Sequence, residues 1–492
     1  MPMIVSANVS ALLDAISAGD EDRVIRETLQ LIGPEHVPPA KIAARAGIAA
    51  AWAGGDAHPL VALSPVGQIT LWMKSIPPTP DPDAEARQNL APIFPLVQSF
   101  MAIANLVKRG LPEPHPQMPE PILPATIRHD GGVIGALKET VVSGDLARAR
   151  GILMGLYATG TDYRALLTNI YGAVATRYPE GGHVLSQIVG GVRVLDMAEW
   201  GDRTPAFIYW ATPLMLDKTP DTPAAETART YASAGDHDLG WLRTRLAIPK
   251  PEAAGADFQR ALVAGDGGAA CDAVLGALRD GANQAAVASG IALAAADRVN
   301  SVPAGDLESL VRAAHVLQYA HAVHVVMLQT QNREVWPLLF TAACAVNAVR
   351  VTGSPADLER GAASGPSATP GGLIAASMLR RLEQQVYEGD TASALALARR
   401  YVQMGHPARA LAGIATSVAS MRDIREDQPL SYHIMPTVAA AAEEYLALPP
   451  ALASGGYNSL LVAMVRLASE LSAGHVLADK LRAAIAAHLG QV

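Results

Sequence analysis

The chain has 492 residues and a formal net charge of −8; half of its residues are hydrophobic and only 5% are aromatic. An acidic chain without a basic cluster argues against nucleic acid as the main partner. Two cysteines are too few for a disulfide framework or a thiolate metal site, and they suit a reducing compartment. The N-terminus lacks a signal-peptide pattern and the apolar runs are interrupted early, so we expect a soluble cytoplasmic protein with no membrane partner.

The first predicted helix covers residues 9–18, with Asn8 or Ser10 as its cap, and a Gly-Asp corner separates it from the next helix. This arrangement of helix, Gly-Asp corner and Ala-rich helix recurs. The corner glycines lie 125, 121 and 124 residues apart: Gly19, Gly144, Gly265 and Gly389. Near-constant spacing indicates an internal repeat. The sequence therefore predicts an all-α protein of four quasi-repeats that form one compact helical body: residues 1–124, 125–250, 251–372 and 373–492.

Each corner leads to a second helix, a helix of small residues, a variable loop and then a histidine that is expected to open another apolar helix. These histidines follow the corner aspartates by 38, 38, 49 and 43 residues: His58, His183, His315 and His433. Pro-rich stretches at 77–82, 111–124, 220–223 and 353–372 are predicted to be extended connectors.

Familiar catalytic motifs are missing, since the chain has no Gly-rich phosphate loop, GxSxG elbow, HExxH or CxxC. What remains is histidine without nearby carboxylates, and imidazole suits iron, copper, zinc or nickel. Equivalent helix starts in four repeats can converge, so we expect one shared metal site made by His58, His183, His315 and His433. The alternative is that each histidine caps a helix or bonds a backbone carbonyl.

The apolar run from Val311 to Asn347 contains three histidines. On a helix with about 100° per residue, His321 and His324 lie about 60° apart, while His315 lies about 120° and 180° from them. His321 and His324 should therefore not share the metal of His315. They are candidate catalytic groups, or histidines whose hydrogen bonds are satisfied in the core.

Five further residues are candidates for substrate binding: Tyr319, Arg203, Trp210, Arg333 and Trp336. Arg203 precedes Pro205 and Arg333 precedes Pro337, and a proline near the first helical position is typical of a helix start. The alternative is that the two arginines form ion pairs at these corners. For the two tryptophans, the alternative is that they are ordinary core residues.

The segments HVLQYAHAVHVV (315–326) and GGHVLSQIVGGVRVL (181–195), on helical repeats, resemble the questin oxidase-like family. The resemblance implies an all-helical oxygenase that uses a mainly histidine-bound non-heme iron and O₂ in Baeyer–Villiger-type or ring-opening oxidation of quinone-like molecules. The family's metal shell can include a carboxylated lysine. No lysine lies in the predicted helices of His183, His315 or His433, so water, Glu199 or His324 would complete the shell.

We therefore expect a non-heme iron oxygenase, with copper as the alternative metal, that acts with O₂ on an aromatic or quinone-like small molecule. An all-histidine shell leaves the metal with a positive net charge and favours an anionic phenolate or enolate substrate. The competing hypothesis is a non-catalytic helical repeat scaffold that presents a groove to a protein partner.

Overall fold

A computed structural model describes residues 9–54, 57–78, 84–107, 117–233, 256–351, 375–424, 430–448, 458–471 and 474–490. Within these ranges the chain is helical, and its strand-like geometry is limited to an isolated antiparallel bridge between Pro179 and Asp221. The all-α class is confirmed. The predicted connector at 353–372 lies outside the described residues, as do Asn8 and parts of the connectors at 77–82 and 111–124.

No helix in the described part of the chain is both long enough and apolar enough to cross a membrane.

The chain divides into two compact units, each built from separate stretches of sequence. Unit 1 comprises Met1–Pro116, Gly190–Phe207 and Ala356–Val492, and unit 2 comprises Gln117–Val189 and Ile208–Pro355. The chain passes from unit 2 to unit 1 within α11 (His183–Met197) and returns within α12 (Thr204–Met215). The division into four repeats stays a prediction.

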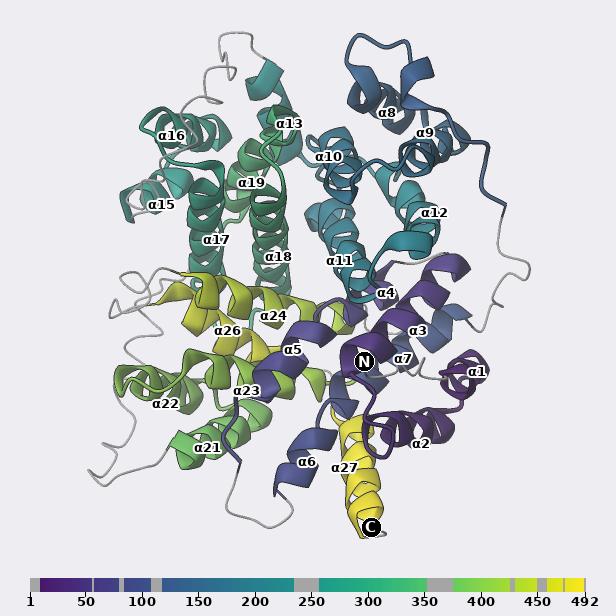
Figure 1. The fold of residues 1–492 in the computed structure, drawn as a ribbon. Helices are drawn as coiled ribbons and strands as arrows, with labels where there is room; N and C mark the ends of the chain where they lie inside the picture. Colours follow the sequence, from purple (N-terminus) through teal and green to yellow (C-terminus); the bar gives the residue numbers. More distant parts are fainter. Residues whose placement is uncertain are drawn as a thin grey trace. The chain divides into compact units, whose positions relative to one another are not determined.

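Unit 1 is formed by helices from both ends of the chain (Figure 1). Its helices are α1 (Ser10–Ala18), α2 (Glu21–Ile32), α3 (Pro39–Ala53), α4 (His58–Leu63), α5 (Val66–Met73), α6 (Ala84–Leu90), α7 (Ile93–Val107), α21 (Ala375–Glu388), α22 (Thr391–Gln403), α23 (Ala408–Ser420), α24 (Ser431–Ala447), α26 (Ser459–Glu470) and α27 (Val476–Leu489). In this unit α24 packs on α26, α23 and α4, so the two ends of the sequence share one core. Arg193, on the unit 1 part of α11, donates to Glu443 on α24 at 2.8 Å.

Unit 2 has α17 and α18 as its most extensively packed pair of helices, and they run side by side in Figure 1. Its elements are η1 (Pro124–Thr126), α8 (Gly132–Ser143), α9 (Leu146–Ala158), α10 (Tyr163–Val174), η2 (Glu180–Gly182), α13 (Pro223–Ser233), α15 (Ala256–Val263), α16 (Gly267–Arg279), α17 (Gln284–Asn300), α18 (Leu307–Gln329), η6 (Arg333–Val335) and α19 (Pro337–Ala348). Small buried residues such as Ala288, Gly290 and Ala292 line α17, and small side chains at a contact let helix axes approach closely.

The four Gly-Asp corners have the same local geometry. Gly19, Gly144, Gly265 and Gly389 all have φ between +65° and +81°, a region that glycine occupies without steric cost. Each following aspartate caps the next helix, and its side chain accepts the backbone N–H three residues later: Asp20 from Arg23, Asp145 from Arg148, Asp266 from Ala269 and Asp390 from Ser393. One helix therefore ends and the next begins with almost no loop between them.

A Gly-Asp pair that was not predicted, Gly305 and Asp306, has the same backbone geometry and the same cap, although the preceding helix α17 already ends at Asn300. Gly305 has φ +84°, and Asp306 accepts the backbone N–H of Ser309 at 3.1 Å. These contacts with Ser309 lower the pKa of the Asp306 carboxyl below its usual value. Because Asp306 caps α18, this helix begins eight residues before His315, and the expectation that His315 opens a helix is wrong.

Other predicted helix starts are found where they were expected. His58 is the first residue of α4, His183 is the first residue of α11, and His433 is the third residue of α24. Pro337 is the first residue of α19 and Pro205 the second of α12, as the position of each proline indicated. Ser10 does not cap α1, because it is the first helical residue and no side chain makes the capping bond there.

Replacing the cap of one corner should lower stability without changing the fold. For Asp145→Ala we expect the free energy of unfolding to fall by about 0.5–2 kcal/mol, because the Arg148 N–H loses its acceptor. Asp145→Asn should retain most of the stability, since its amide oxygen still accepts this bond. Urea unfolding followed by circular dichroism measures both variants, and equal losses would show that the cap does not explain the effect.

Candidate functional site

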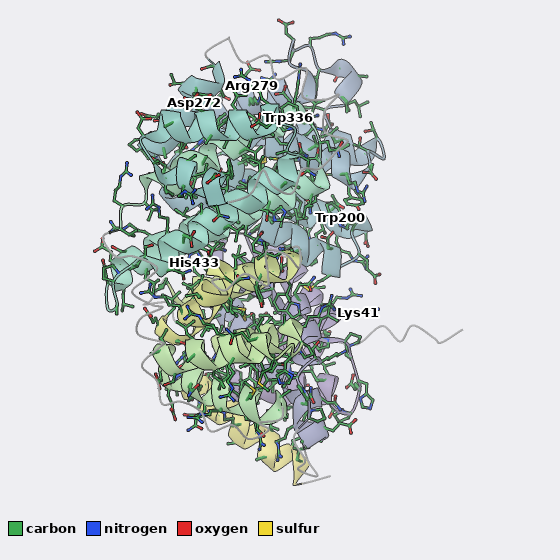
Figure 2. All side chains as sticks on the ribbon, turned by 90° about the vertical axis from the view of Figure 1, so that its left-hand side faces the viewer. Lys41, Trp200, Asp272, Arg279, Trp336 and His433 are labelled. Carbon is green, nitrogen blue, oxygen red and sulfur yellow. The ribbon has the colours of Figure 1, made fainter. Side chains whose placement is uncertain are left out.

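The four histidines predicted to be metal ligands contact one another in two pairs, one in each unit. In unit 2, the rings of His183 on α11 and His315 on α18 have centroids 4.9 Å apart and planes at 79°. In unit 1, the rings of His58 on α4 and His433 on α24 have centroids 5.0 Å apart and planes at 82°. Figure 2 marks His433 on its helix. A ring nitrogen of His58 lies within 4.8 Å of one of His433.

The geometry of each pair fits two ligands of one metal ion. Histidine nitrogens bind such ions at about 2.0–2.1 Å, so two imidazoles at neighbouring positions on one ion have centroids roughly 4.5–5.2 Å apart. Both measured separations lie in this range. Perpendicular rings at this distance are also the ordinary edge-to-face arrangement of aromatic side chains. The donor set therefore fits a first-row metal, and it fits plain aromatic packing as well.

Two glycines let the segment before His183 lie directly against α18. Gly181 and Gly182 have φ of +73° and +81°. A Cβ atom on Gly182 would come within 2.3 Å of the Tyr319 ring, and one on Gly181 within 3.1 Å of the Cβ of His315. Any other residue would force this segment away from α18. The GGH sequence therefore sets the distance at which His183 meets His315.

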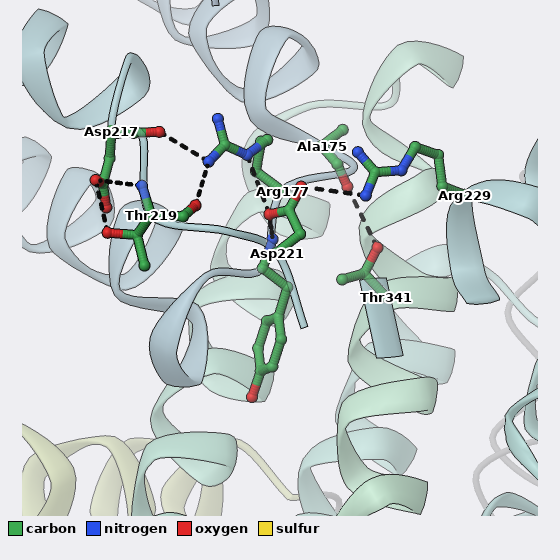
Figure 3. Close-up of polar contacts among 8 residues, drawn as sticks. Ala175, Arg177, Asp217, Thr219, Asp221, Arg229 and Thr341 are labelled. Atoms are coloured by element: carbon green, nitrogen blue, oxygen red, sulfur yellow. Dashed lines mark hydrogen bonds and ion pairs between the residues drawn. The ribbon is translucent and has the colours of Figure 1, made fainter. Parts of the chain in front are cut away.

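A partly buried carboxylate, Asp221, also holds this segment of the chain (Figure 3). Asp221 accepts from the Arg177 side chain at 3.0 Å and from the Tyr178 backbone N–H at 2.9 Å, and its second oxygen lies 3.1 Å from Arg229. Arg177 also donates to the backbone oxygens of Asp217 and Thr219. The chain five residues before His183 is thus held by charge-assisted hydrogen bonds, which are roughly twice as strong as neutral ones.

Tyr319, a predicted substrate-binding residue, lies one helical turn after His315 on α18 and is fully buried. Its ring packs edge-on against Tyr178, with centroids 4.7 Å apart. Its hydroxyl has no hydrogen-bond partner among the described residues. Burial raises the pKa of this hydroxyl well above its usual value, so it stays protonated. A buried hydroxyl without a partner costs about 1–3 kcal/mol, and Tyr319 is therefore a strong candidate for contact with a ligand.

His321 and His324, the predicted catalytic residues, are both buried on α18. This helix runs without a break from Leu307 to Gln329. The angles calculated for a regular helix therefore apply, and these two side chains point away from the direction of His315.

The predicted arginines form ion pairs with their sequence neighbours. Arg203, at the end of η3 (Gly201–Arg203), lies 3.1 Å from Asp202, and Arg333 lies 3.6 Å from Glu334. Glu334 is also bound by Lys138 at 2.8 Å. These contacts match the ion-pair alternative, and a role in substrate binding stays a prediction for both arginines.

The predicted tryptophans are buried. Trp336, marked in Figure 2, donates its indole N–H to the side-chain oxygen of Gln284 at 2.7 Å. The Gln284 amide in turn donates to the backbone oxygens of Met327 and Thr330, beyond the end of the histidine-rich part of α18. Trp336 is thereby fixed in the unit 2 core. Trp210 is also buried, and its role in substrate binding stays a prediction.

Unit 2 has a surface cavity that sequence reasoning did not indicate. Its volume is about 460 Å³, and its lining contains no histidine: Gly131, Val133, Ile134, Ala165, Thr168, Asn169, Thr330 and Asn332. Asp221 and Tyr178 were also missed. The Gly-Gly pair before His183 could have drawn attention to Tyr178, but nothing in the sequence relates Asp221 to Arg177.

Comparison of the chain with protein-family models, with curated proteins and with solved structures finds no match.

Removing the Asp221 carboxylate should destabilise unit 2. For Asp221→Ala we expect a loss of about 1–3 kcal/mol in the free energy of unfolding, because the partly buried Arg177 side chain and the Tyr178 backbone N–H both lose their acceptor. Asp202→Ala is the matched control: its carboxylate is 84% exposed, so breaking its pair with Arg203 should cost at most about 1 kcal/mol. Similar losses for both variants in denaturant unfolding would contradict a special role of Asp221.

Proposed function

We propose that this protein binds a transition metal through His58, His183, His315 and His433. One observation supports the proposal most directly. These four of the thirteen histidines were predicted as ligands from the sequence alone, and the ring of each one contacts the ring of another predicted ligand. The partners are distant in sequence, since His58 and His433 come from the two ends of the chain. Each pair has the ring separation that two ligands of one ion require.

We further propose that the metal is iron, with copper as the alternative, and that the protein is an oxygenase. This step rests on the resemblance of the histidine-rich segments to the questin oxidase-like family. Bound iron would supply the activation of O₂ for Baeyer–Villiger-type or ring-opening oxidation of an aromatic or quinone-like molecule. Neutral imidazole ligands leave the ion's positive charge uncompensated, and this charge favours an anionic phenolate or enolate substrate.

The chain's own residues would bind and orient the substrate. The protonated Tyr319 hydroxyl is suited to donate a hydrogen bond to a substrate oxygen, and the apolar surroundings that bury it would exclude water. His321 and His324 are suited to hold or move a proton, because an imidazole ring carries both a donor and an acceptor nitrogen. Trp210, Trp336, Arg203 and Arg333 remain candidates for contacts with the substrate.

The alternative is a non-catalytic helical scaffold. The edge-to-face geometry favours it, because aromatic packing alone gives ring pairs at these separations. In that case the histidines stabilise the two units and bind no ion.

Metal analysis separates the two functions. If these histidines are metal ligands, purified protein should contain iron or copper, and His183→Ala or His433→Ala should each lower the metal content while helicity is retained. His488→Ala, in the last turn of α27, is the matched control and should keep the metal. Unchanged metal content in both variants would contradict the ligand assignment, and metal-free wild-type protein with an intact fold would favour the scaffold.

A second experiment tests the catalytic role of His324. His324→Gln keeps the size and hydrogen-bonding capacity of the side chain but removes the ionisable group. We expect turnover, measured as O₂ consumption with a panel of phenols and hydroxyquinones, to fall about 10²–10⁴-fold while the metal content is unchanged. Unchanged turnover would assign His324 to the core, and loss of the metal would contradict the separation of His324 from the ligands.

A further inference from the structure

The two cysteines of the chain meet in the core of unit 2. Cys271 on α16 and Cys344 on α19 are 73 residues apart in sequence, and their Sγ atoms lie 3.4 Å apart. Both side chains are buried, with exposed fractions of 0% and 1%. α16 and α19 pack directly on each other, and both pack on α13, so the contact forms between well-anchored helices.

The surroundings of the pair favour sulfur chemistry over metal binding. The Cys344 thiol donates to the backbone oxygen of Gly267 at 3.4 Å, and the nearby carboxylate of Asp272 accepts a hydrogen bond from Tyr231 at 2.7 Å. Figure 2 marks Asp272 on α16. In the described part of the chain, neither cysteine belongs to a group of three potential metal ligands. The sulfurs therefore have each other as their main reactive neighbour.

The two thiols differ in acidity. The contact between the two sulfurs, in which either thiol can be the donor, raises the pKa of Cys271 and lowers the pKa of Cys344. The thiolate is the nucleophilic form of cysteine, and this difference favours Cys344 as the attacking sulfur. The Cys271 sulfur lies 3.4 Å away, which is the position that a resolving cysteine needs.

We propose that Cys271 and Cys344 form a two-electron redox site that a hydroperoxide oxidises to a disulfide. The Cys344 thiolate attacks the terminal peroxide oxygen, the O–O bond breaks, and the other oxygen leaves with a proton as water or an alcohol. Cys344 is then a sulfenic acid. The Cys271 sulfur attacks it, the S–S bond forms, and the sulfenic oxygen leaves as water with the Cys271 proton.

Little movement is needed for the second step. A disulfide has a sulfur–sulfur distance of about 2.05 Å, and the sulfurs are already in contact at 3.4 Å. The bond would close a loop that contains α17 and α18, so oxidation would constrain the segment that carries His315 and Tyr319. This site does not depend on the proposed metal, and it can be tested in metal-free protein.

The test uses the full chain, reduced and then treated with hydrogen peroxide. After denaturation in an excess of alkylating reagent, intact mass spectrometry should show two adducts on reduced protein and none on oxidised protein, with both adducts restored by dithiothreitol. The oxidised monomer should also have a higher thermal midpoint, because the cross-link restricts the unfolded chain.

Two variants test the order of the steps. Cys271→Ser leaves Cys344 without a resolving thiol, so dimedone should trap a sulfenic acid on it. Cys344→Ser should give little of this adduct, because the remaining thiol is the less acidic one. The proposal is overturned if peroxide leaves both wild-type thiols open to alkylation, converts them separately to sulfinic acids, or links two chains on a non-reducing gel. Equal trapping in both variants would overturn the assignment of Cys344 as the attacking sulfur.

Discussion

The architecture depends on a way of ending one helix and starting the next within two residues. A glycine with positive φ ends the first helix, and the aspartate that follows satisfies a backbone N–H at the start of the second. Among the described residues, three corners have this geometry: Gly19–Asp20, Gly144–Asp145 and Gly389–Asp390. At Gly265–Asp266 one further residue lies between the two helices. Because so little chain lies between them, the two helices of each corner pack as neighbours.

Two glycines and one carboxylate position the histidine pair of unit 2. Gly181 and Gly182 bring the backbone close to α18 because they have no side chains. Asp221 holds the same backbone through charge-assisted hydrogen bonds, with Arg177 as its main partner. Between these restraints lies Tyr319, whose buried hydroxyl has no partner in the described part of the chain. In this region the charged side chains are paired, while the Tyr319 hydroxyl remains available for a hydrogen bond. Such a combination is expected of a ligand site.

Local features of the structure were predictable from the sequence, and contacts between distant segments were not. The corners follow from capping, and the starts of α12 and α19 follow from the position of a proline; both effects act within a few residues. His315 was placed wrongly because the cap at Asp306 was overlooked, although the same rule predicts it. The choice of histidine partners and the meeting of Cys271 with Cys344 depend on tertiary packing, which one sequence does not reveal.

The discontinuity of unit 1 has a consequence for biosynthesis. Its core combines Met1–Pro116 with Ala356–Val492, while unit 2 is built from residues between them. During translation, α7 and its buried Phe100 leave the ribosome long before α23, which packs against α7, has been made. The N-terminal helices must therefore wait with apolar surface exposed while the whole of unit 2 is synthesised. The contact of His58 with His433 is consequently among the last that a newly made chain can form.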